Sequence, residues 1–206
     1  MPAMMQGYWN GEVACLETGV PTTVLRANFF QGHLLKTEME NILNHGFFKC
    51  PLGVCRNSFV STNDVGELAA VTLLEGPEKH GDKFYDVTGP APQNMHEVAA
   101  DLSEVLGKKI EYRPQDLDEF EKDFGKIRRE FFEYLNNGFY TRVSPDFYNL
   151  TGRKPTSWKQ HLTNKGAAGE TGLEDLHQAG PHVCCTDERW FLLGLFKSSI
   201  RLSDNI

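Results

Sequence analysis

The chain has 206 residues, of which 40% are hydrophobic, so its length supports one domain with a sizeable core and leaves little room for two. Its formal net charge of -7 and isoelectric point near 5.5, with lysine and arginine dispersed along the chain, provide no basic patch for nucleic acid. Because no secretory signal and no apolar run of roughly 20 residues is visible, we expect a cytoplasmic protein without nucleic-acid or membrane partners.

The N-terminal part of the chain alternates helical and extended patterns. Residues 12–17 predict a short helix that ends at Gly19, and residues 22–30 have the β-branched, apolar composition of a buried strand in a parallel sheet. Residues 31–44 then carry apolar side chains near one face, which predicts a helix. Residues 46–61 predict two short extended segments around Pro51, in a hairpin-like arrangement.

The same alternation continues through the middle of the chain. A helix is expected from residue 61 onward, with several possible N-caps at 61–64, and a strand over 83–89. A helix over 93–107, closed by its terminal glycine, is followed by a brief strand over 108–113. This order indicates an α/β layer architecture.

A long amphipathic helix is expected after residue 116, broken or bent near Gly125. Its apolar stripe could line a hydrophobic pocket, but we interpret it as the buried face of a helix. The members of this stripe are Phe120, Phe124, Ile127, Phe131 and Tyr134.

The amino-acid composition of the chain changes near residue 163, so we expect a domain over 1–162 and a poorly ordered tail over 163–206. That tail holds an apolar cluster from Trp190 to Phe196, for which docking on the domain, binding of a partner and an abnormal terminus remain open.

Five cysteines form an odd set, which is typical of reduced thiols rather than of a small disulfide-bonded domain. A zinc site could be composed of four of them and one histidine, but the paired CxxC spacing of structural zinc is absent, and no metal is expected. The residues of that alternative are Cys50, Cys55, His182, Cys184 and Cys185.

Four segments, in this order, resemble NmrA-like atypical short-chain dehydrogenases/reductases. They are YWNGEVACLETGVPTTVLRANFF (8–30), PLGVCRNSFVSTNDVGELAA (51–70), GDKFYDVTGPAPQNMHEVAADLSEVLGKKIEYR (81–113) and LTGRKPTSWKQHL (150–162). The resemblance covers residues 7–162. It implies a partial Rossmann-like fold with a parallel sheet remnant and a smaller substrate-side α+β region. It also implies an oxidoreductase or a sensor of NADP or NAD, with a small-molecule substrate or a partner protein.

The glycine-rich loop that holds the cofactor phosphates in such folds is missing from its expected place before this segment of the family. Gly166, Gly169 and Gly172 have the spacing of that loop, but they follow a polar segment rather than a buried strand, so we interpret them as chance. We therefore expect cofactor binding to be weak or lost.

The resemblance assigns five residues to the cofactor side: Tyr8, Ala27, Asn28, Phe29 and Phe30. Tyr8 stands where the family has histidine or lysine, and an aromatic residue at a frayed terminus is the alternative interpretation. Ala27 replaces the usual proline, and Phe30 could equally fill core volume. No general acid is assigned.

Three further polar residues receive structural interpretations. Asp64 is interpreted as an N-cap of its helix rather than as a catalyst. Glu12 is expected to be a solvated helix residue, and Arg26 to pair with a carboxylate that the sequence does not identify.

Three hypotheses for function follow. The first is a truncated NmrA-like protein, derived from an NAD(P)-dependent reductase, that keeps the substrate-side residues. The second is a non-enzymatic redox-sensing or protein-interaction module. The third is a fragment of a longer product in which Met1 is not the true start.

Overall fold

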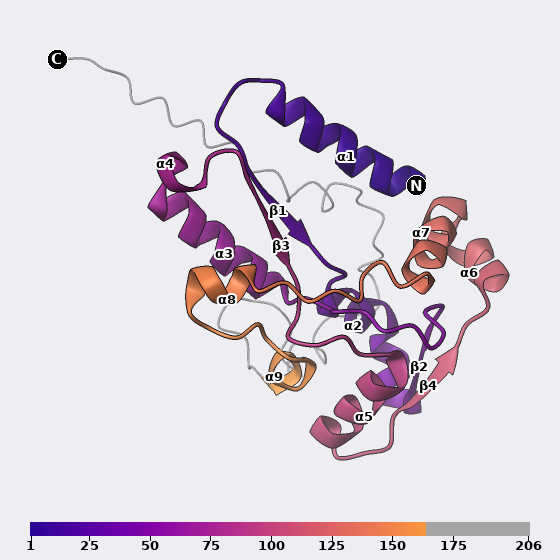
Figure 1. Ribbon diagram of the computed structural model, residues 1–206. Coiled ribbons are helices and arrows are strands. Elements are labelled where there is room, and N and C mark those ends of the chain that lie inside the picture. The colour runs from indigo at the N-terminus through magenta and orange to yellow at the C-terminus, as the bar shows by residue number, and fades with distance from the viewer. Residues whose placement is uncertain (164–206) are drawn as a thin grey trace.

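A computed structural model describes residues 1–163. The expected tail, with its three spaced glycines, its two cysteines and its apolar cluster, lies outside the described residues. The described part contains two small parallel sheets, each with its own helices and its own core (Figure 1). This mixed α/β arrangement is a partial Rossmann-like fold, as the sequence predicted.

The first sheet contains β1 (Thr23–Ala27) and β3 (Lys83–Val87), which pair in parallel. Figure 1 shows helices α1 and α3 on either side of this pair. The core here is formed by the buried side chains of Val60, Leu68, Val87 and Phe147. The helices of this part are α1 (Ala3–Leu16), α3 (Thr62–Glu75), α4 (Pro77–His80) and α8 (Asp146–Thr151).

The second sheet contains β2 (Phe47–Cys50) and β4 (Glu111–Pro114), also in parallel. It supports the larger core, in which Phe48, Leu52, Met95, Leu102 and Trp158 are almost fully buried. The elements around it are α2 (Gln31–Glu40), the π-helical turn η1 (Asn41–His45), α5 (Met95–Leu106), α6 (Leu117–Phe124), α7 (Lys126–Asn136) and α9 (Trp158–Thr163).

The predicted hairpin over residues 46–61 is wrong. Phe47–Cys50 pairs in parallel with Glu111–Pro114, about 60 residues further along the chain. The rest of the segment forms isolated bridges, Asn57 with Gln93 and Phe30 with Val60. Local turn signals around Pro51 show that the chain reverses, but they carry no information about a partner strand distant in sequence.

Helix boundaries were predicted better than strand partners. Gly125, with φ of 83°, separates α6 from α7, which confirms the expected break. Helix α5 has a capping box, in which Asn94 accepts from the Glu97 amide at 3.0 Å while Glu97 accepts from the Asn94 amide at 2.9 Å. Helix α1, by contrast, begins at Ala3, so the predicted 12–17 helix is only its last part.

The assignment of Asp64 as N-cap is wrong. The N-cap of α3 is Ser61, whose hydroxyl accepts a hydrogen bond from the Asn63 amide at 3.2 Å. The Asp64 carboxylate is fully buried and is used elsewhere. It accepts from the Thr156 amide at 2.6 Å, from the Thr156 hydroxyl at 2.7 Å and from Arg153 at 2.6 Å. Asp64 therefore joins α3 to the segment before α9.

Candidate functional site

Four segments meet where β1 and β3 end. The amide of Asn28 donates to Val87 at 2.9 Å, and the amide of Gly89 donates to Ser58 at 3.2 Å. Ser58 in turn donates to the carbonyl of Tyr140 at 2.9 Å. Ligands of open parallel sheets bind beyond the carboxyl ends of the strands, so this junction is the expected place for a site.

Gly89 shows how tightly this junction is packed. A Cβ at Gly89 would lie 2.0 Å from the carbonyl oxygen of Phe59, so only glycine fits there. The space beside the glycine is thus filled by protein backbone. The turn after β3 therefore cannot receive a phosphate group in the way that a glycine-rich loop does.

Asn28 is a positioning residue in this junction. Its side chain is only 7% exposed, its Nδ2 donates to the Tyr140 carbonyl at 3.1 Å, and its Oδ1 accepts from the Phe29 amide at 2.6 Å. These contacts hold the loop after β1 against the 138–144 segment. The role of Asn28 beside a cofactor stays a prediction.

Phe29 is at the centre of an aromatic cluster. Its ring lies 5.6 to 6.0 Å from four other rings, those of His33, Phe59, Phe131 and Phe132. Such edge and tilted contacts fix the ring without burying it completely. Phe30 follows at the N-terminus of α2 and bridges to Val60, while Ala27 ends β1. Cofactor contacts by these three residues also remain predictions.

A small groove, here called the aromatic groove, opens beside Phe29 between α2, α6 and α7. Its volume is about 40 Å³, well below the few hundred Å³ that enclose a typical small molecule. A ligand would therefore lie across its rim or displace a rim side chain. The lining residues are Phe29, His33, Leu34, Thr37, Glu38, Lys49, Cys50, Pro51, Gln115, Phe120, Phe124, Arg128 and Phe132.

The polar residues of the aromatic groove favour a neutral imidazole beside a fixed cation. Burial lowers the pKa of His33, and the positive charges of Arg128 and Lys36 lower it further. At neutral pH, His33 is therefore uncharged and can donate or accept one hydrogen bond at each ring nitrogen. Arg128 of α7 and Lys49 of β2 are the cationic side chains that line the groove.

The apolar stripe predicted in residues 117–134 divides between two roles. Phe120 and Phe131 are buried, in agreement with the core interpretation. Phe124 is 39% exposed on the rim of the aromatic groove, and Ile127 is 57% exposed. The break at Gly125 rotates α7 relative to α6, and a single helical stripe is therefore not buried along its whole length.

Tyr8 lies on α1 and is 41% exposed. Burial of part of the phenol raises its pKa to about 12, so the hydroxyl keeps its proton at neutral pH. It is not among the residues that line the aromatic groove. Tyr8 therefore has an accessible hydroxyl but no defined substrate position, and its predicted role is untested.

Arg26 and Glu12 form a pair that the sequence did not identify. Two hydrogen bonds of 3.1 and 2.5 Å join the guanidinium to the carboxylate, and the Arg26 guanidinium lies 4.7 Å from the centre of the Phe84 ring. The Glu12 side chain is only 12% exposed, so its prediction as a solvated residue is wrong. The pair fastens α1 to the face of the first sheet.

No cluster of three or more potential metal ligands occurs within residues 1–163. Cys15, Cys50 and Cys55 are free thiols there, and burial raises the pKa of Cys50 well above its usual range. The other members of the zinc alternative lie outside the described residues.

None of the helices within residues 1–163 has the length and apolar character needed to cross a bilayer.

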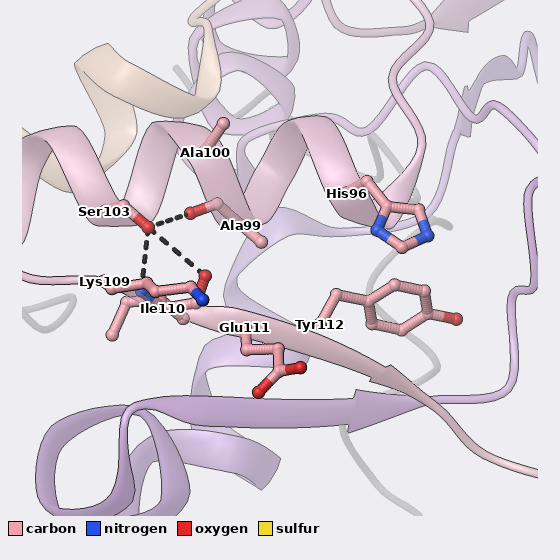
Figure 2. A pocket seen from close by; sticks show the side chains of 8 residues that line it. All are labelled: His96, Ala99, Ala100, Ser103, Lys109, Ile110, Glu111 and Tyr112. Carbon is pink, nitrogen blue, oxygen red and sulfur yellow. Dashed lines mark hydrogen bonds between the residues drawn. The ribbon is translucent and has the colours of Figure 1, made fainter.

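A wider hollow of about 520 Å³ lies between α5 and β4 (Figure 2). Ser103 is one of the lining residues, and its hydroxyl accepts from the Ile110 amide at 2.8 Å and donates to the Ala99 carbonyl at 2.7 Å. These bonds hold the residue before β4 against α5. We therefore interpret the hollow as a surface feature of the fold, and the aromatic groove as the candidate site.

The described residues form a parallel α/β protein whose candidate site lies at the carboxyl edge of its strands. No protein-family model matches the chain. Among solved structures, it is similar to the Citrobacter sp. triphenylmethane reductase, with 25% identity, a TM-score of 0.62, and coverage of 74% of this chain and 55% of that one. An NADPH-dependent quinone oxidoreductase from Escherichia coli has the same fold, with 21% identity, a TM-score of 0.67, and coverage of 77% and 61%.

Two curated relatives are also similar. The NAD(P)H azoreductase of Xenophilus azovorans is 28% identical over 177 residues, which cover 79% of this chain and 61% of the relative. The prestalk A differentiation protein A of Dictyostelium discoideum is 27% identical over 153 residues, covering 69% and 50%. The chain thus spans between half and about three fifths of the length of these relatives. These similar proteins include NAD(P)H-dependent reductases, and the chain shares the fold of the solved ones.

Proposed function

We propose that the described part of this chain is the substrate-side half of an NAD(P)H-dependent reductase site, and that the chain by itself binds the cofactor weakly. The observation that carries this proposal is the position of the aromatic groove. It opens beside Phe29, directly after β1, at the carboxyl edge where parallel sheets place their ligands.

The substrate class follows from the lining of the groove. Phenylalanine rings from three elements, with Phe124 on the rim, favour a flat, conjugated compound that stacks on them. The names of the similar proteins denote reductases of azo compounds, triphenylmethane dyes and quinones, which are conjugated acceptors. We therefore propose a conjugated aromatic or quinonoid compound as the ligand of the aromatic groove.

We expect weak cofactor binding because of the groups that the described residues present to the cofactor's phosphates. A pyrophosphate needs backbone amides at a glycine turn between a buried strand and a helix. The loop after β1 carries Asn28 and two phenylalanines there, and the turn after β3 is filled by the Phe59 carbonyl. The residues of this part therefore fit the substrate side of the site and do not fit the phosphates.

Calorimetric titration of NADPH into the 206-residue chain tests this proposal. We expect a dissociation constant of about 1 mM or weaker, corresponding to roughly -4 kcal/mol or less favourable. A parallel titration with menadione, a neutral quinone, should show binding that Phe124→Ala reduces and Phe139→Ala leaves unchanged. Phe139 is a suitable control because it is 60% exposed and lies outside the groove lining. Submillimolar NADPH affinity would contradict the proposal.

A second candidate is a protein-interaction module, favoured by the surface around β1. Helix α1 has no buried residue, and Trp9 on it is 51% exposed. On α3, Leu73 and Leu74 are 52% and 87% exposed. A partner protein that covers these apolar side chains would give the chain a regulatory role without catalysis.

A further inference from the structure

Arg128 differs from the other arginines of residues 1–163 because no acidic side chain of this part of the chain lies within 4.0 Å of its guanidinium. It is half-buried on α7, and no hydrogen bond to it occurs in this part of the chain. Six other arginines there each form an ion pair: Arg26, Arg56, Arg113, Arg129, Arg142 and Arg153. A cation held at a cleft without a counter-charge leaves a local positive potential for a ligand.

The surroundings of Arg128 combine this charge with aromatic surface. The guanidinium lies 5.8 Å from the centre of the Phe124 ring, and its charge acts on His33 on the facing helix α2. Both neighbours line the aromatic groove. Arg128 is thus placed where a flat ligand lying against Phe124 would present its edge.

The single carboxylate that lines the aromatic groove does not neutralise Arg128. Glu38 belongs to α2, and its Oε2 accepts from the Lys49 amide at 2.9 Å and from the Asn41 side chain at 3.0 Å. These bonds hold the carboxylate on the α2 side. Lys49 of β2 is the other cation that lines the groove, on the same side as Glu38. Arg128 is therefore the cation on the α7 side of the groove.

We propose that Arg128 selects flat aromatic ligands that carry a carboxylate or sulfonate, binding the anion with its guanidinium while the ring system lies against Phe124. The proposal rests on the function proposed above, in which the groove receives a conjugated compound, and it adds the charge of that compound. Arginine suits this role because its planar donor fork matches two oxygens of a carboxylate or sulfonate at once.

Binding of two matched probes to the 206-residue chain tests the role of Arg128. Naphthalene-2-sulfonate carries the anion, and 2-naphthalenemethanol is a neutral compound of similar shape. Calorimetric titration should show that the sulfonate binds more tightly to the native chain. In Arg128→Gln its affinity should fall about tenfold, which corresponds to about 1.4 kcal/mol, while the affinity of the alcohol stays unchanged. Arg128→Lys should retain part of the preference, because it keeps the charge without the fork.

Arg142→Gln is the matched control, since it removes the same charge from an arginine that is 78% exposed and 3.8 Å from Asp86. The native pattern of affinities is expected in this control. Equal affinities for the two probes in the native chain, or an equal loss in both glutamine variants, would overturn the role of Arg128 and leave the groove as a binding site. If neither probe binds, this inference and the substrate side of the proposed function both fail, whatever the NADPH titration shows.

Discussion

Neighbouring residues after β1 have different tasks because their side chains meet different partners. Asn28 satisfies main-chain groups of Phe29 and Tyr140, whereas Phe29 contacts rings from three other segments and faces the aromatic groove. The resemblance grouped both with the cofactor side. The sequence could not show that Asn28 holds a loop while Phe29 lines a cleft. Both roles depend on contacts with residues that are distant in sequence.

His33 should make the stability of the protein depend on pH. Its folded-state pKa lies below the usual value near 6.5, because burial and the charges of Arg128 and Lys36 disfavour the imidazolium. Between the folded and unfolded pKa values the unfolded chain binds more protons, so the free energy of unfolding falls as the pH drops below about 6.5. His33→Gln should lose this contribution, as measured by urea unfolding at pH 7.5 and 5.5.

His45→Gln serves as the control for this measurement, because His45 is exposed at the end of the π-helical turn. It should retain the native decrease in stability between the two pH values. An unchanged decrease in His33→Gln would show that other groups, and not this imidazole, account for the acid sensitivity.

At the scale of elements, the contact between α3 and the segment before α9 depends on one buried carboxylate. Asp64 accepts three hydrogen bonds from Arg153 and Thr156, and Arg153 also bonds Glu67 at 2.5 Å. Together, Asp64 and Glu67 raise the pKa of Arg153 above its usual value, chiefly through the hydrogen bond with Glu67. The sequence presented these residues in two separate segments and did not connect them.

Asp64→Asn should weaken this connection strongly. The amide cannot accept at all of the positions that the carboxylate uses, so the Thr156 amide and the arginine lose charge-assisted partners. We expect the free energy of unfolding to fall by about 2–4 kcal/mol. Thermal and urea unfolding would measure the loss. Asp118→Asn, at a side chain that is 78% exposed, should change stability little, and an equally small effect for Asp64 would refute the structural role.

Helices were predicted more reliably than the pairing of strands. Capping at Asn94 and the helix break at Gly125 are local events, determined by residues within one or two turns. The partners of β2 and of Arg26, by contrast, are brought together by packing of the larger core and of α1. No periodicity in the sequence contains that information.

At the scale of the whole molecule, no strand among residues 1–163 pairs with the outer edge of β1 in the first sheet. Asn28 donates to Val87, and because amides alternate in direction along a strand, those of Ala27, Leu25 and Thr23 point away from β3. The other edge of the sheet is covered, since the Asp86 amide donates to Asp146 of α8 at 2.8 Å. A two-stranded sheet with an open edge has little stability of its own and attracts further strands.

The open edge and the apolar side chains beside it should bind other surfaces. We expect the purified chain to bind a hydrophobic dye and to associate at increasing concentration in light scattering. The double variant Trp9→Glu and Leu74→Glu should reduce both signals, because these side chains are 51% and 87% exposed. Val54→Glu, at an exposed position away from α1 and α3, should not. A native chain that stays monomeric and binds no dye would remove the support for an interaction module.

The sequence by itself determined the α/β class, most helix limits and the segment that carries Phe29. These follow from the periodicity of apolar residues, from capping and from ordered motifs, all of which act over short distances along the chain. Only the tertiary structure decided that β2 pairs with β4, that Asp64 is buried against Arg153, and that Arg128 lies on an aromatic groove without an ion-pair partner among residues 1–163. Each of these depends on which distant segments share a core, and burial gives a charge or a ring its function.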